Sequence, residues 1–246
     1  DPLSQIIEIV SFFLVVKLTS FKTLILSLPV LYLRFTLFNL RRTLMNKSFI
    51  IKIIVFCLVT IKVSAIEKVI LFGDSLMAGY GLPNEQHLSV VLQRSLEFDG
   101  HNIKIINGSV SGSTSAGGLN IAEWTLSENN IDLMILCLGA NDMLRGINPK
   151  ETKNNLEEII QIAKNKNIKV IIAGMIAPTS YGYAYKKSFD KIFSDLSKKH
   201  KLQLIPFLLE GVAQNPKFNL SDGMHPNDQG TIIIGNTLKK AILENL

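Results

Sequence analysis

The sequence is poor in cysteine: among its 246 residues only Cys57 and Cys137 occur. Beyond residue 65 a single cysteine remains, so no internal disulfide can form there. Cys137 lies in an apolar run and is predicted to be a small filler of a buried strand rather than a nucleophile. No cluster of Cys and His has the spacing of metal ligands, so neither a metal nor an organic cofactor is expected.

Two familiar loop motifs are missing as well. The lipase-type elbow G-x-S-x-G is absent, which disfavours an α/β-hydrolase proper. The glycine-rich stretch 108–118 lacks the G-K-[ST] ending of a phosphate-binding loop. Both absences narrow the classes of enzyme that the sequence allows.

The C-terminal part of the chain has no excess of charge. Residues 1–65 hold eight of the 26 Lys and Arg residues and two of the 20 Asp and Glu residues, which leaves 18 of each sign in residues 66–246. The net charge of +6 therefore belongs to the N-terminal part. Nucleic-acid binding needs positive charge on the folded domain itself, so no nucleic-acid partner is expected.

A secretory signal is predicted at residues 45–65. Met45 is the first methionine, and it is followed by basic residues, the apolar stretch 53–61 and the tripeptide Val-Ser-Ala at 63–65. This order is typical of a signal peptide cleaved near Ala65, which predicts a periplasmic or secreted protein. A retained anchor is the alternative, although nine apolar residues fall short of the roughly 20 that span a bilayer.

Residues 1–44 are interpreted as an upstream segment, with over-extended translation as the preferred explanation. Residues 66–246 are predicted to form one domain, since they suffice for a proper core. Apolar runs of strand length alternate there with longer segments of helical period. This pattern predicts an α/β fold, a three-layer flavodoxin-like sandwich with about five parallel strands and helices on both faces. Strands are expected at 68–72, 103–106, 133–138, 169–174 and 203–206, and helices at 87–98, 118–126, 150–166, 185–199 and 228–245.

Ser75 is the first candidate for a nucleophile. The apolar run 69–72 leads straight into Gly73, Asp74 and Ser75, which reads as a buried strand ending in a tight turn. In a parallel sheet the crevice for ligands lies outside the carboxyl ends of the strands, so a hydroxyl at this turn would meet substrate. The alternative is that Asp74 and Ser75 merely turn the chain and cap the next helix.

A base for Ser75 is found near the C-terminus. Asp222 precedes His225 by three residues, a spacing at which one turn brings the two side chains together. The carboxylate can then hold the Nδ1 proton while Nε2 faces Ser75. On its own, Asp-Gly followed by His-Pro could also be only a turn.

Four separated motifs carry a resemblance to a known family: GDSL with Ser75, SVSGST with Gly112, GAND with Asn141, and DGMHP with Asp222 and His225. In this order they resemble the SGNH hydrolases, also called the GDSL family. The match spans essentially all of residues 66–246 and is closest to the bacterial group of periplasmic thioesterase I, lysophospholipase and arylesterase. Ser113 is a departure, because many relatives in this group carry aspartate there.

The resemblance implies a serine esterase that hydrolyses small acyl esters or thioesters through an acyl-enzyme, of the arylesterase, acyl-CoA thioesterase or lysophospholipase type. Ser75 would attack, His225 would carry the proton and Asp222 would orient the imidazole. The backbone N–H groups of Ser75 and Gly112 and the amide of Asn141 would form the oxyanion hole. The alternatives are a carbohydrate O-acetyl esterase and an exported binding module without catalysis.

The stretch 175–185 is the candidate for substrate recognition. It is rich in aromatic and small residues and carries no charge, which suits an apolar groove for a linear acyl chain. Pro178, Tyr181 and Tyr183 of this stretch are therefore predicted to bind substrate. Asp74, next to the candidate nucleophile, is predicted to bind substrate as well. Membrane contact is expected only through the leader or a lipid substrate. The alternative is a tyrosine-rich surface turn that packs on its own helix.

Overall fold

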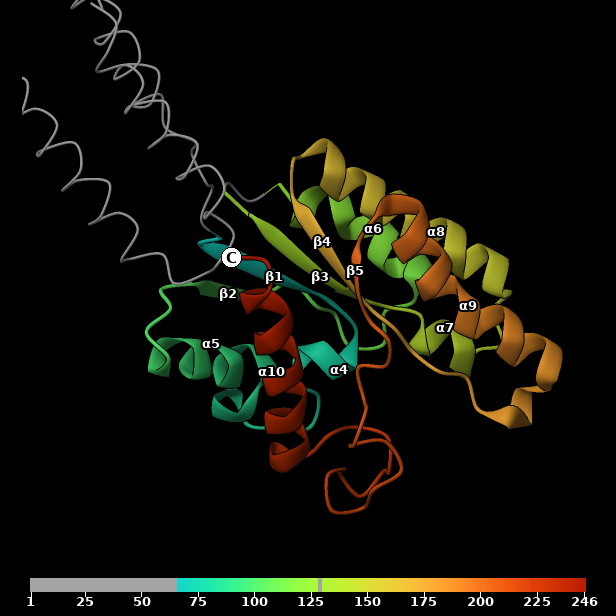
Figure 1. Cartoon of the computed structure of the whole chain (residues 1–246). Coiled ribbons are helices and arrows are strands. Elements are labelled where there is room, and N and C mark those ends of the chain that lie inside the picture. The colour runs from blue at the N-terminus through green and yellow to red at the C-terminus, as the bar shows by residue number, and fades with distance from the viewer. Residues whose placement is uncertain (1–65, 128–129) are drawn as a thin grey trace, which may run out of the picture. The chain divides into compact units, whose positions relative to one another are not determined.

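The computed structural model describes residues 66–127 and 130–246 (Figure 1). The predicted upstream segment 1–44 and signal 45–65 lie outside the described residues. Within the described ranges, no helix has the length and apolar character needed to cross a membrane.

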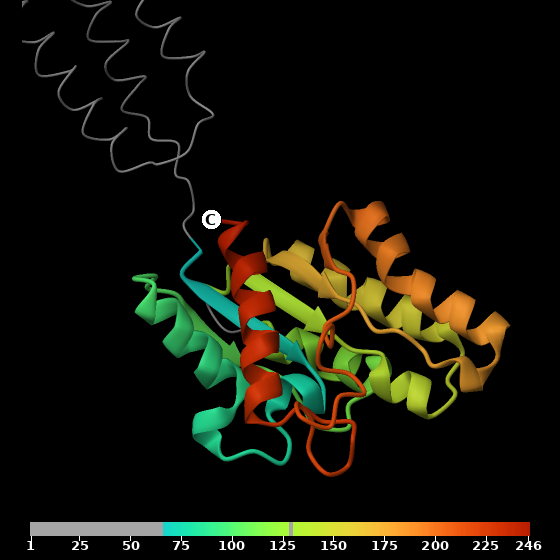
Figure 2. The ribbon, with the colours of Figure 1, turned by 60° about the horizontal axis from the view of Figure 1, so that its bottom comes forward.

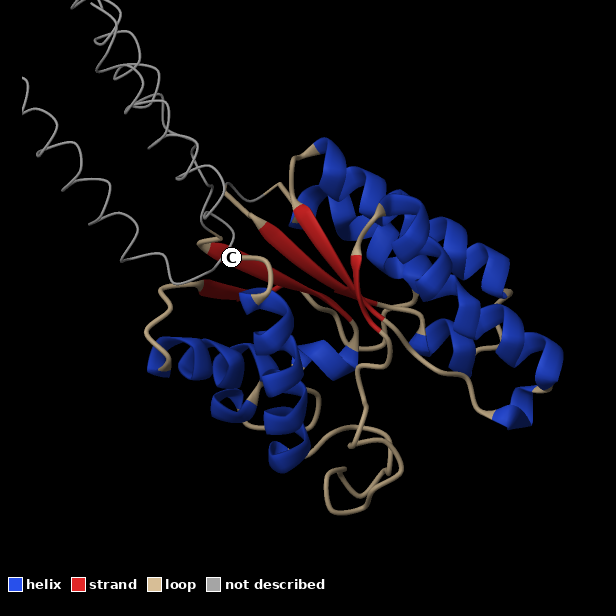
Figure 3. Ribbon diagram, viewed as in Figure 1, coloured by secondary structure: helices blue, strands red, loops and turns tan. Residues whose placement is uncertain are grey.

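Five parallel strands form one sheet in the order β2-β1-β3-β4-β5. In chain order they are β1 (Lys68–Gly73), β2 (Lys104–Asn107), β3 (Leu133–Cys137), β4 (Lys169–Ala173) and β5 (Gln203–Ile205). The three central strands are almost wholly apolar and buried, which is typical of parallel strands covered on both faces. Figure 3 shows the strands in red between two layers of helices, so the predicted α/β sandwich is confirmed.

The long helices divide between the two faces of the sheet, as Figures 1 and 2 show from two directions. On one face α5 packs against α10, and on the other α8 packs between α6 and α9. Their bounds are α5 (Leu88–Phe98), α6 (Ser115–Thr125), α8 (Pro149–Asn165), α9 (Tyr183–His200) and α10 (Asp228–Leu243). Pro149 begins α8, where its missing N–H costs no hydrogen bond.

The boundaries of the strands and long helices lie within two residues of the predicted ones, except at the start of α6. The helix expected from Gly118 begins at Ser115, because Thr114 caps it by accepting a hydrogen bond from the N–H of Gly117. Gly118 lies within the helix and allows close packing, because a Cβ on it would lie 2.3 Å from Cδ1 of Leu138. Helix α9 begins at Tyr183, two residues before its predicted start.

Two very short helices follow strands and were not predicted. They are α4 (Ser75–Ala78) after β1 and α7 (Ala140–Leu144) after β3. The chain leaves β1 for its neighbour β2 and then returns to pair β3 with the other side of β1. The carboxyl ends of β1 and β3 therefore flank the point where the strand order reverses, the usual place for a ligand in such a sheet.

Candidate active site

Ser75 is placed by the end of β1. A Cβ on Gly73 would lie 2.7 Å from the carbonyl oxygen of Cys137 and 2.7 Å from Cγ of Met77, so β1 can end this close to β3 only with glycine there. Asp74 then caps α4, accepting the N–H of Leu76 at 3.1 Å. Ser75 is the first residue of that helix and is half-buried. The turn predicted from the sequence is present, and it directs a hydroxyl to the edge of the sheet.

Asp222, His225 and Ser75 form one hydrogen-bonded line. Nε2 of His225 lies 2.9 Å from Oγ of Ser75, and Nδ1 lies 2.6 Å from Oδ2 of Asp222. The ring of Tyr80 packs against the imidazole with a centroid separation of 4.4 Å. The structure therefore brings together the serine, histidine and carboxylate that the sequence pairs across 150 residues of chain.

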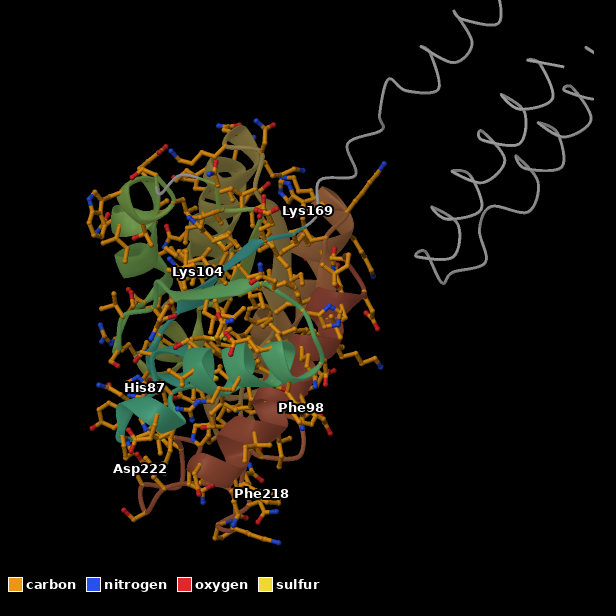
Figure 4. The ribbon with its side chains drawn as sticks, turned by 90° about the vertical axis from the view of Figure 1, so that its left-hand side faces the viewer. His87, Phe98, Lys104, Lys169, Phe218 and Asp222 are labelled. Carbon is orange, nitrogen blue, oxygen red and sulfur yellow. The ribbon has the colours of Figure 1, made fainter. Side chains whose placement is uncertain are left out.

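Hydrogen bonds within the loop that carries Asp222 and His225 stabilise its conformation. Oδ1 of Asp222 accepts the N–H groups of His225 at 3.0 Å and Met224 at 2.9 Å. These bonds, with the bond from the His225 ring, lower the pKa of Asp222 to about 2. The N–H of Leu220 also donates to the carbonyl of His225 at 2.7 Å, closing the loop. Figure 4 shows Asp222 at the end of the molecule away from Lys169, the first residue of β4.

Gly112 and Asn141 come from the next two loops of the same edge. The loop after β2 is tied to β1, because the N–H of Val110 donates to the carbonyl of Gly73 at 3.0 Å. Gly112 has a φ of +78°, a conformation that favours glycine. Asn141 lies in α7, and its amide donates to Oδ2 of Asp74 at 3.2 Å. The three loops that the sequence assigns to one edge are therefore joined by hydrogen bonds.

Asp74 was predicted to bind substrate, and the structure corrects this. Its side chain is fully buried, with the N–H of Leu76 and the amide of Asn141 as partners. Burial raises the pKa of Asp74 to about 6, against the lowering effect of those two hydrogen bonds. Asp74 therefore holds Asn141 from behind and does not reach the mouth of the site.

Residues 71–231 match the sequence model of the GDSL-like lipase/acylhydrolase family. An arylesterase of Vibrio mimicus is 34% identical over 194 residues, which cover 79% of this chain and 96% of that relative. The chain belongs to this family. As a member of the GDSL-like lipase/acylhydrolase family, it is an ester hydrolase.

Two further comparisons agree with the family assignment. Thioesterase 1/protease 1/lysophospholipase L1 of Escherichia coli strain K12 is 30% identical over 185 residues, covering 75% of this chain and 88% of the relative. A crystal structure of TesA is 32% identical with a TM-score of 0.69, and the match covers 73% of this chain and all of that one. The SGNH-type fold expected from the motifs is therefore confirmed.

A cleft of about 450 Å³ lies at the same edge of the sheet, beyond β4 and β5. Pro178 lines it, together with Ile176, Phe207 and Leu209 among others. Tyr181 and Tyr183 do not line it. The ring of Tyr181 packs in a tilted arrangement against that of Tyr185 of α9, with a centroid separation of 5.4 Å, and Tyr183 is 79% exposed. The alternative interpretation, a tyrosine-rich turn packing on its own helix, describes Tyr181 better.

Sequence reasoning overlooked a buried carboxylate beside Asn141. Asp142 is fully buried, and it accepts the N–H of Ser115 at 2.7 Å, the hydroxyl of Ser115 and the hydroxyl of Thr152 at 3.1 Å. The available signal was its place directly after Asn141 in an otherwise apolar stretch. Cys137 is free and fully buried, as predicted, and burial raises the pKa of its thiol well above the usual value.

Proposed function

We propose that this ester hydrolase works through an acyl-enzyme on Ser75. The observation that carries the proposal is the hydrogen-bonded line from Asp222 through His225 to the Ser75 hydroxyl. A binding module has no need of a base aimed at a serine, so the arrangement favours catalysis over binding alone. Chelators are expected to leave the rate unchanged, because each step uses this chain's own side chains and backbone.

The first half-reaction forms a covalent intermediate. Oγ of Ser75 bonds to the acyl carbon, and its proton passes to Nε2 of His225, while Asp222 holds the Nδ1 proton. The tetrahedral species then breaks its bond to the alcohol or thiol, which leaves with the proton from His225. The acyl group remains on Ser75.

The second half-reaction repeats these steps with water. His225 takes a proton as the water oxygen bonds to the acyl carbon, and collapse releases the carboxylic acid and returns the proton to Ser75. In both half-reactions the developing oxyanion would accept hydrogen bonds from the backbone N–H groups of Ser75 and Gly112 and from one N–H of the Asn141 amide. Each such donor is typically worth about 3 kcal/mol of barrier.

Asn141 suits this part because its amide has two N–H groups. One N–H donates to Asp74 and so fixes the plane of the amide, and the second can donate to the substrate. A neutral donor is also appropriate, since the charge it meets exists only after attack. The buried Asp74 carboxylate therefore supports the proposed donor without contacting the substrate.

For the substrate we propose linear acyl esters or thioesters. Ser75 itself lines only a small hollow, of about 10 Å³, with Tyr80 and Pro226. The larger cleft at the same edge of the sheet, lined by Ile176, Phe207 and Leu209 among others, has room for more than an acetyl group, and we propose that the acyl chain extends into it. The names of the relatives, arylesterase and thioesterase 1/lysophospholipase L1, favour the same class. A carbohydrate O-acetyl esterase is the alternative, and it predicts that acetyl esters are the best substrates.

The test combines labelling with turnover. A serine-directed fluorophosphonate should label the wild type and not Ser75→Ala, and hydrolysis of a chromogenic ester should disappear with the label. Ser109→Ala is the matched control, a serine of a neighbouring loop whose hydroxyl donates to the Leu71 carbonyl at 2.9 Å. Labelling of Ser75→Ala at full rate would refute the nucleophile. A series of paired esters and thioesters from acetyl to medium chain length then selects between the substrate classes.

We also propose that the protein is exported with cleavage after Ala65. The support lies in the sequence: basic residues after Met45, the apolar stretch 53–61 and the small residues at 63–65. N-terminal sequencing of the protein from a periplasmic or culture fraction should begin at Ile66. A form that keeps Met45 and stays in the membrane would contradict this proposal.

A further inference from the structure

Helix α7 holds the Gly112 loop at two points. Nη2 of Arg145, the C-cap residue directly after α7, donates to the carbonyl oxygen of Gly112 at 3.0 Å. Three residues further along the loop, the N–H of Ser115 donates to the buried carboxylate of Asp142 at 2.7 Å. Asn141 lies in the same helix, so one short element contacts the loop on both sides of Thr114 and also presents the amide.

The Gly112 end of the loop has little packing to hold it. Gly112 is exposed, and a Cβ built on it would meet no atom within 4 Å. Its φ of +78° belongs to a turn that the N–H of Ser113 closes by donating to the carbonyl of Val110 at 3.1 Å, and no neighbouring side chain stands where a Cβ would lie. The Arg145 guanidinium supplies a bond to the carbonyl that flanks the same Cα as the Gly112 N–H.

Arg145 is itself fixed relative to Asn141. Its backbone N–H donates to the carbonyls of Asn141 at 3.1 Å and Asp142 at 3.2 Å. The N–H of Ile147 then returns to the carbonyl of Asp142 at 2.9 Å, which closes the turn after the helix. The hydrogen bond from Arg145 to Gly112 therefore fixes the Gly112 N–H relative to the Asn141 amide.

We propose that Arg145 is a positioning residue that fixes the Gly112 N–H relative to the Asn141 amide through its bond to the Gly112 carbonyl. The proposal rests on the function proposed above, because it concerns the same oxyanion hole. Arg145 would act on the transition state, because there the Gly112 N–H and the Asn141 amide donate hydrogen bonds to a single oxygen. An exposed arginine is ordinarily a solvated surface charge, and that interpretation predicts no kinetic effect.

The second alternative is that Arg145 binds an anionic part of the substrate. Among the described residues no carboxylate pairs with it, so its charge is available for such a role. Kinetics on an uncharged ester, such as a nitrophenyl ester of a short fatty acid, separate the two roles. Loss of positioning lowers kcat and kcat/KM together, whereas loss of binding raises KM.

The experiment compares Arg145→Met, Arg145→Lys and a matched control, Arg94→Met. Arg94 is also exposed and also donates to a backbone carbonyl, that of Glu85 at 3.2 Å, but it lies in α5 away from the site. Arg145→Met should lower kcat on the uncharged ester by about tenfold, with KM and the melting temperature nearly unchanged. Arg145→Lys should recover most of the rate, because one N–H donor suffices for one carbonyl.

A second measurement, the rate of inactivation, reports on the oxyanion-hole donors directly. The rate of inactivation by an uncharged organophosphonate should fall in Arg145→Met by the same factor as kcat/KM, since the adduct places a phosphoryl oxygen on the same donors. Wild-type kinetics for Arg145→Met, a change in KM alone, or a matching loss of thermal stability would each overturn the proposal. If the wild type shows no hydrolysis that depends on Ser75, the proposed function fails and this inference fails with it.

Discussion

The two halves of the carboxyl edge of the sheet are built differently. After β1, β2 and β3, the loops are joined by side-chain hydrogen bonds, and the carboxylates of Asp74 and Asp142 are fully buried within them. After β4 and just after β5, residues of the segments 176–179 and 207–214 surround an open cleft in which Ile176 is 46% exposed, and the chain then continues to the loop of Asp222 and His225. The first half has the rigidity that transition-state stabilisation requires, and the second leaves room for acyl groups to differ.

The largest effect is expected at Asp222. Asp222→Asn keeps the size of the side chain but favours the wrong imidazole tautomer, so kcat should fall by roughly 10⁴-fold. Asp228→Asn is the matched control, an exposed aspartate in the first turn of α10. Steady-state kinetics on one chromogenic ester measure both. A loss below tenfold for Asp222→Asn would show that catalysis depends on Asp222 far less than its geometry suggests.

The burial of Asp74 should appear as pH-dependent stability. Because the folded-state pKa is raised from 3.8 to about 6, the folded protein binds the proton more tightly, and this contribution is lost as the pH rises from about 4 through 6. Asp74→Asn cannot ionise. Its unfolding free energy relative to wild type should therefore improve between pH 4.5 and 7.5, by up to about 3 kcal/mol.

Urea unfolding of both proteins at the two pH values measures this difference. Asp99→Asn provides the control, since Asp99 is an exposed carboxylate on the same domain. An equal pH dependence in wild type and Asp74→Asn would mean that burial does not govern the ionisation of Asp74.

A substitution at Asn141 tests whether the loops after β1, β2 and β3 stabilise the transition state. Asn141→Ala should lower kcat by about 100-fold with little change in KM, since the amide meets charge only after attack. Asn155→Ala is a suitable control, because that amide donates to the Ser115 hydroxyl at 2.9 Å on the far side of Asp142. A pure rise in KM for Asn141→Ala would assign this residue to substrate recognition.

These residues also show how far the sequence leads. The buried strands were predictable because apolar runs such as 133–138 reflect burial on both faces, and Asp222 and His225 because three residues of separation bring them together. The three catalytic loops could be assigned to one edge because parallel strands end at the same side. The order of the four motifs along the chain indicated the family to which the protein belongs.

The remaining features depend on contacts between distant residues. Helices α4 and α7 are too short to show a period, and α7 is held by bonds such as that from Ser115 to Asp142, 27 residues apart. The burial of Asp74 follows from what packs over it, which no local pattern encodes. The packing of the Tyr181 ring against Tyr185 likewise depends on the tertiary fold.

The smallest effect is expected in the cleft, where the sequence and the structure favour different residues. The sequence predicted that Tyr181 or Tyr183 changed to alanine would flatten the rise of kcat/KM with acyl length. The structure instead places Leu209 in the cleft lining and leaves Tyr183 exposed beside Lys187, whose Nζ lies 6.0 Å from the ring centroid. Each buried methylene contributes up to about 0.8 kcal/mol, or roughly fourfold in kcat/KM.

Leu209→Ala should therefore reduce the preference for medium-length chains over acetyl by a few-fold while sparing acetyl turnover, because fewer methylenes lose contact with water. Tyr183→Ala is its matched control and should keep the wild-type slope of kcat/KM against chain length. Both slopes come from one ester series measured on the three proteins. If Tyr183→Ala flattens the slope and Leu209→Ala does not, the acyl chain lies along the tyrosine-rich turn, and the first prediction is the correct one. If acetyl esters are best for the wild type, the acetylesterase alternative replaces both, because neither side chain then has a methylene to bury.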